Sequence, residues 1–96
     1  MPWERDQIRT SLTSKGFELD TDRDHDVLTL RAQGLTRAIW TKLSRGRKYR
    51  VYGDGLLAEM CTQLMVTKPQ LNRLIGCDMD GAEYLTVLRD RGLFRV

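Results

Sequence analysis

His25 is the single histidine of the chain and its first candidate for acid–base chemistry. An imidazole has an unperturbed pKa near neutrality, so it can take or give a proton at pH 7. Asp24 and Asp26 flank it, but successive side chains of a regular strand point to opposite faces, so both carboxylates should turn away from the ring. We therefore predict that His25 acts without them; the alternative is a polar residue at a strand edge.

A block of basic residues follows the histidine. Residues 31–50 contain seven lysines and arginines and no acidic side chain, whereas the whole chain has a net charge of only +3. Cations interleaved with Trp40, Tyr49 and Tyr52 are typical of a surface that holds phosphates and stacks bases. The alternative is a solvated strand and loop whose charges prevent self-association. The predicted nucleic-acid-binding residues are Arg37, Trp40, Lys42, Arg45, Arg47, Lys48 and Arg50.

Other site motifs are missing or incomplete. The sequence has no GxxxxGK[ST] loop and no nucleophile elbow, which argues against nucleotide hydrolysis and against a Ser-His-Asp hydrolase. Residues 78–81 match only part of a calcium loop and fit a helix N-cap better. Cys61 and Cys77 are not a CxxC pair, and one histidine leaves too few ligands for a zinc site, so no metal or cofactor is expected. Both thiols are predicted to be small buried hydrophobes in a reducing cytoplasm.

The spacing of hydrophobic residues changes along the chain between helical and strand periodicity, and it predicts the elements that must position these residues. Its 96 residues, 41% hydrophobic and 30% charged, suit one globular domain without a membrane span or an apolar signal segment. We expect a helix over residues 3–15 that ends before Gly16, strands over 17–20, 25–31 and 35–43, and an aperiodic loop over 44–55. Helices should then start near Asp54, at Thr67 with a capping box, and at Asp80. The predicted fold is α+β, a three-stranded antiparallel sheet with helices packed on one face, in the order α-β-β-β-α-α-α.

Side-chain alternation predicts which residues share the open face of that sheet. If Leu28 and Leu30 pack against the helices, His25 lies on the opposite face. If Ile39 and Leu43 are core residues in the third strand, its other face carries Trp40 and Lys42 beside the histidine. We therefore expect an imidazole, an indole and cations together on an uncovered surface; the alternative places Trp40 in the core.

Four short motifs lie between residues 6 and 66: Lys15-Gly16-Phe17 at the end of the first helix, His25 at the start of the second strand, the hairpin at Gly34, and the helix near Leu56-Leu57. Together they resemble the HicA-like family of small bacterial toxins. The resemblance implies a double-stranded-RNA-binding-domain-like α-β-β-β-α fold, cleavage of messenger RNA by the strand histidine, and an antitoxin that covers it. Before the histidine the family has Gly-Ser, whereas this chain has Arg23 and Asp24.

Residues 67–96 form a predicted helical extension of this HicA-like core within one domain, 1–96. The first functional hypothesis is a cytoplasmic, metal-independent endoribonuclease that uses His25. The second is a non-catalytic adaptor of phage or defence origin that binds nucleic acid or a nucleoprotein and needs only the basic block. The third is docking of a partner, or a second copy, on the C-terminal helices through Leu71, Leu74, Tyr84 and Leu88, although such stripes usually form core.

Overall fold

The computed structural model describes residues 2–21, 25–44, 46 and 49–95. Its elements are β1 (Trp3–Glu4), α1 (Arg5–Thr13), β2 (Phe17–Thr21), β3 (His25–Leu30), β4 (Trp40–Ser44), β5 (Val51–Tyr52), α2 (Asp54–Leu64), α3 (Lys68–Ile75) and α4 (Gly81–Asp90). The α+β class is confirmed, with a small additional sheet of β1 and β5. No helix in this described part of the chain is long and apolar enough to cross a bilayer.

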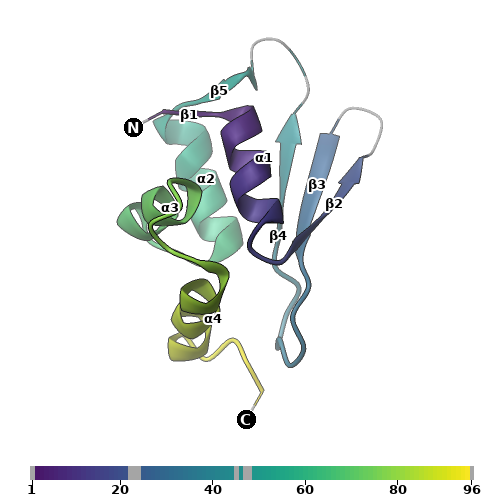
Figure 1. The fold of residues 1–96 in the computed structure, drawn as a ribbon, viewed down its shortest axis with the longest axis vertical. Coiled ribbons are helices and arrows are strands. Elements are labelled where there is room, and N and C mark those ends of the chain that lie inside the picture. The colour runs from purple at the N-terminus through teal and green to yellow at the C-terminus, as the bar shows by residue number, and fades with distance from the viewer. Residues whose placement is uncertain (1, 22–24, 45, 47–48, 96) are drawn as a thin grey trace.

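The larger sheet is antiparallel, in the order β2-β3-β4, and the helices lie on one side of it (Figure 1). Burial alternates along β3: the even-numbered residues 26–30 are buried, and the odd-numbered residues 25–29 are half-buried. Buried leucines and isoleucines of α1, β3 and β4 belong to one hydrophobic cluster. One face of the sheet therefore packs on the helices, and no helix or strand of the described residues covers the other, which we call the uncovered face.

The N-terminal end differs from the predicted helix. Trp3–Glu4 pairs with Val51–Tyr52, inside the segment expected to be an aperiodic loop. The Trp3 indole nitrogen donates a hydrogen bond to Asn72 Oδ1 at 2.9 Å, and its ring lies where a side chain at Gly76 would meet it at 3.2 Å. These partners are about 50 to 70 positions away, so local periodicity gives no signal for them.

The third strand is shorter than predicted and begins at Trp40. Residues 31–39 form a connection that pairs with the C-terminal segment: Leu35 forms an isolated bridge with Phe94, and the Thr36 amide donates to the Leu93 carbonyl at 2.9 Å. Gly34 adopts a φ of 87°, a conformation that favours glycine, at the turn of this connection. The C-terminal segment thus pairs with the connection between β3 and β4.

The helix caps mostly follow the sequence signals. Thr67 and Gln70 form the predicted capping box of α3, and Asp80 accepts the Glu83 amide at the start of α4. Asp54, in contrast, is the first helical residue of α2, and Gly53 is the N-cap. Asp54 still lies where its charge suits the helix dipole.

The C-terminal helices share the core with the sheet. Tyr84 stacks on Phe17 with ring centroids 5.8 Å apart, and its hydroxyl donates to the Leu64 carbonyl at 2.8 Å. Burial raises the pKa of the Tyr84 phenol far above its usual range. The residues considered above for docking, Leu71, Leu74, Tyr84 and Leu88, are all buried. They hold the fold together, so the hypothesis that they form a docking surface is wrong.

Candidate nucleic-acid interface

Strand register determines which residues share the uncovered face. His25 lies opposite Ser44, Val27 opposite Lys42, and Thr29 opposite Trp40. Directly opposed residues in an antiparallel sheet point to the same face. Together with the buried Ile39 and Leu43, this confirms that the imidazole, the indole and the ammonium share one face. The residues of β2 on that face are Glu18 and Asp20, opposite Thr29 and Val27.

His25 is half-buried at the start of β3. Within the described residues no hydrogen bond to its ring is found. The neighbouring Asp26 points the other way, as alternation predicts: it is only 5% exposed, and Arg9 Nε of α1 donates to its carboxylate at 3.1 Å. Asp26 therefore serves the packing of α1 on the sheet and not the imidazole; Asp24 lies outside the described residues.

Asp20 is a carboxylate of this face that the sequence reasoning missed. It lies on β2 opposite Val27, so it is a diagonal neighbour of His25 across one strand pair. Such neighbours are separated by about 7–8 Å, a distance that a carboxylate and an imidazole can bridge through one water. The sequence signal was the short separation of the two predicted strands, 17–20 and 25–31, which limits the registers in which they can pair.

Trp40 and Lys42 are the predicted binding residues with the most open positions on this face. The Trp40 side chain remains 46% exposed although it sits within a strand. An indole accessible on a sheet offers a flat apolar surface for a base. Lys42 is exposed and lies opposite Val27, so it is closer than Trp40 to His25 along the sheet. Its ammonium can reach a phosphate bound there.

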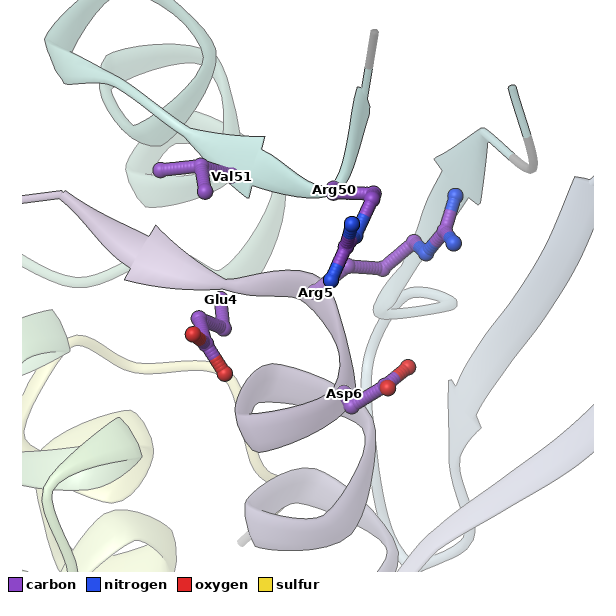
Figure 2. A pocket seen from close by; sticks show the side chains of 5 residues that line it. All are labelled: Glu4, Arg5, Asp6, Arg50 and Val51. Carbon is purple, nitrogen blue, oxygen red and sulfur yellow. The ribbon is translucent and has the colours of Figure 1, made fainter. Parts of the chain in front are cut away.

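The remaining basic residues do not gather on this face. Arg37 is exposed in the connection beyond the Trp40 end of the sheet. Arg50 is exposed just before β5, where it lines a hollow of about 180 Å³ with Glu4, Arg5, Asp6 and Val51 (Figure 2). Arg45, Arg47 and Lys48 lie outside the described residues.

Two other arginines near the face are committed to structural contacts. Arg5 Nη1 donates to the Ser44 carbonyl at 2.8 Å and to the Gly46 carbonyl at 3.1 Å, so α1 holds the segment that follows β4. Arg31 forms an ion pair with Glu18 at 2.9 Å, both side chains being exposed. Sequence counting treats Arg31 as part of a free basic block, whereas across the sheet it has an acidic partner.

The cysteines correct a further expectation. Cys61 is half-buried, and burial raises the pKa of its thiol, as expected of a structural cysteine. Cys77 is exposed after the end of α3, so its predicted burial is wrong. The apolar neighbours in the sequence, Ile75 and Met79, turn inward while the intervening turn faces outward. The described residues contain no group of three or more histidine, cysteine or acidic side chains arranged to hold a metal ion.

No protein-family model matches the chain, and no curated protein or solved structure matches it either. Over residues 5–64 the elements follow in the order α1-β2-β3-β4-β5-α2, which has one short strand more than the α-β-β-β-α order expected from the sequence.

Proposed function

We propose that the chain is a HicA-like RNA-binding protein and a metal-independent endoribonuclease of the cytoplasm, in which His25 moves the proton. The observation that carries the proposal is the common face of His25, Lys42 and Trp40. An imidazole can transfer the proton, a lysine can stabilise the phosphate charge and an exposed indole can stack a base, so the three together suit RNA cleavage without a metal ion.

The chemistry uses the RNA's own 2′-hydroxyl. His25 accepts the proton of that hydroxyl while its oxygen attacks the adjacent phosphorus. The bond from phosphorus to the 5′ oxygen breaks, that oxygen takes a proton from solvent, and a 2′,3′-cyclic phosphate remains. Lys42 stabilises the charge that develops on the phosphate oxygens. DNA lacks the attacking hydroxyl and should bind without being cut.

The substrate is single-stranded where it contacts the sheet, since a base can stack on Trp40 only when it is splayed out. Trp40 and His25 lie at opposite ends of the segment over which β3 and β4 pair. His25 is opposite Ser44, which is four residues from Trp40 along β4, a separation of about 13 Å at about 3.3 Å per residue. The stacked base and the cleaved phosphate therefore belong to different nucleotides. Arg37 is exposed beyond the Trp40 end of the sheet and can extend the path for the backbone there. Arg45, Arg47, Lys48 and Arg50 stay predicted backbone contacts from the sequence alone. As in the family it resembles, an antitoxin would act by covering His25.

The test is cleavage of a labelled single-stranded RNA in the presence of a chelator. We expect His25→Ala to lose at least about a hundredfold in cleavage rate, the usual contribution of an acid–base residue. Its RNA affinity and its Tm should stay close to those of the unsubstituted protein, because the ring has no described hydrogen bond to lose. The same sequence as DNA is the uncut control. Equal rates of RNA decay with the His25→Ala protein and the unsubstituted protein would show that His25 does not carry out the cleavage.

The second candidate is a non-catalytic nucleic-acid-binding adaptor. The observation that favours it is the absence, among the described residues, of a second acid or base in contact with His25. Such a module would bind RNA with an affinity that falls steeply with salt, form no product, and be indifferent to His25→Ala. The chelator experiment separates the two candidates directly.

A further inference from the structure

The two edges of the larger sheet differ in how their backbone groups are used. At the β4 edge the Ser44 amide donates to the Tyr52 hydroxyl at 2.9 Å, and the Ser44 carbonyl accepts from Arg5 Nη1 at 2.8 Å. At the other edge β2 is the outermost strand (Figure 1), and no further strand of the described ranges pairs with it. The β2 edge is therefore the more open of the two.

The hydrogen-bond pattern determines which groups of β2 point outward. Hydrogen-bonded and non-hydrogen-bonded pairs alternate along an antiparallel ladder. The Arg31 amide donates to the Gly16 carbonyl at 3.0 Å, so the ladder to β3 uses every second residue of β2 from there on. The amides and carbonyls of Leu19 and Thr21 therefore point away from β3, and both residues are exposed. We call these four groups the free edge of β2.

An exposed apolar side chain accompanies the free edge. Leu19 lies opposite the fully buried Leu28 and on the same face of the sheet, yet Leu19 is 39% exposed. Proline, lysine and bulges commonly protect edge strands, whereas β2 contains neither residue and pairs with β3 without a bulge. A strand added here would cover apolar surface as well as supply hydrogen-bond partners.

The charges beside the free edge indicate which kind of strand fits it. Glu18 and Asp20 lie on the uncovered face, at positions where an added antiparallel strand makes non-hydrogen-bonded pairs with Cβ atoms about 4.5–5.5 Å apart. Glu18 already pairs with the exposed Arg31 at 2.9 Å, whereas no ion pair of Asp20 is found in the part of the chain that the structure describes. Opposite charges in such pairs are stabilising. A strand with basic side chains on this face is therefore complementary to β2.

A second copy of this chain fits the free edge poorly. Two β2 strands could pair antiparallel with Leu19 opposite Phe17, Leu19 or Thr21 of the other copy. Each of these registers places Glu18 or Asp20 opposite an acidic residue, and like charges directly opposite are destabilising. The charge pattern thus favours a different chain.

We propose that the free edge of β2 binds an extended segment of another protein, added to the sheet as an antiparallel strand in which lysine or arginine alternates with apolar residues. An apolar side chain opposite Leu19 covers it, and basic side chains face Glu18 and Asp20. Because strands lie about 4.8 Å apart, the added strand is about 10 Å from β3 and borders the uncovered face without covering His25. The interaction goes beyond the proposed RNA cleavage and does not require it.

The test uses capped ten-residue peptides and the amide chemical shifts of the isotope-labelled protein. A peptide of alternating lysine and valine should shift the amides of Leu19 and Thr21 most. The same peptide with glutamate in place of lysine should bind at least about tenfold more weakly. Methylation of the valine nitrogens, which face β2, should abolish binding, whereas methylation of the lysine nitrogens, which face away, should change the affinity by less than about threefold.

Two protein variants test the same contacts from the other side. Asp20→Asn should weaken binding of the lysine–valine peptide about threefold, because it removes one opposite-charge pair. Leu19→Pro removes an amide of the free edge but no ladder bond to β3, a position at which an edge strand accepts proline, and it should abolish peptide binding.

Three results would overturn the proposal: equal affinities of the lysine and glutamate peptides, the largest shifts away from β2, or no shifts at millimolar peptide. Light scattering of the protein alone detects self-association. If it occurred and Leu19→Pro abolished it, a second copy would occupy the edge and the proposal would be wrong. None of these readouts involves RNA, so the peptide site and the proposed ribonuclease can fail separately.

Discussion

Two adjacent residues of β3, His25 and Asp26, have opposite surroundings. Asp26 faces the helices, is nearly fully buried and is held by Arg9; His25 faces the uncovered side, with Lys42 and Asp20 nearby. They are neighbours in the sequence, but only His25 was a candidate for acid–base chemistry. The pleat of one strand separates them into a structural residue and an accessible one.

The largest contrast should come from substituting these two residues one at a time. His25→Ala should abolish RNA cleavage and shift the Tm by less than about 2 °C. Asp26→Asn should do the reverse, because it removes the buried carboxylate that accepts from Arg9 Nε and leaves that guanidinium only the exposed Asp6, 3.2 Å from its Nη2. We expect a loss of about 2 kcal/mol and a Tm lower by about 10 °C, with cleavage retained below the transition.

Thermal unfolding followed by circular dichroism, and cleavage of the same labelled RNA, provide the two readouts. If Asp26→Asn also lost cleavage while still folded, the separation of the two residues by the strand would not describe their roles. Arg9→Met is a second test of the structural side, and it should lower the Tm without changing the cleavage rate.

Local sequence signals predicted the parts of this comparison that depend on alternation. The faces of β3 and β4, the capping box at Thr67 and the N-cap at Asp80 all follow from residues within a few positions of one another. The pairing of Trp3–Glu4 with Val51–Tyr52 and the bridge between Leu35 and Phe94 did not, because each joins segments about 50 to 60 residues apart.

The candidate site shows the same division. The common face of His25, Trp40 and Lys42 follows from period-two alternation, but the ion pair of Arg31 with Glu18 and the location of Arg50 beside α1 depend on tertiary contacts. Apolar sequence neighbours also suggested a buried Cys77, and the turn after α3 reversed that prediction. Counting charges in a segment therefore overstates how many are free to bind a ligand.

The next largest effect should come from the exposed indole. Trp40→Ala should weaken binding of single-stranded RNA about tenfold, since stacking of one base contributes about 1–3 kcal/mol. Val51→Ala is the matched control: this side chain is similarly exposed, at 51% against 46%, but belongs to the small sheet. Fluorescence anisotropy with labelled RNA measures both, and equal losses would mean that any exposed apolar side chain contributes as much as Trp40.

Lys42 should have a smaller effect with a distinct salt dependence. Replacing it with glutamine should weaken RNA binding a few-fold and lower the slope of log affinity against log salt by about one, as expected for one lost phosphate contact. Lys68→Gln removes a charge of the same type from α3, where it pairs with Asp54 at 3.3 Å. That control should leave the slope unchanged; a shift of the same size would indicate a general effect of net charge.

The smallest expected effect concerns Asp20, which shares the uncovered face with Glu18 and lies closer than Glu18 to His25. Its carboxylate lies in the row of Val27 and Lys42 and repels a phosphate bound there. Asp20→Asn should therefore strengthen RNA binding about twofold at low salt, and the gain should disappear as salt screens the charge. Asp90→Asn, at the end of α4, makes the same change of net charge away from the sheet. Anisotropy titrations of the two variants at low and high salt compare them, and an equal gain in both would place the RNA elsewhere than over β3 and β4.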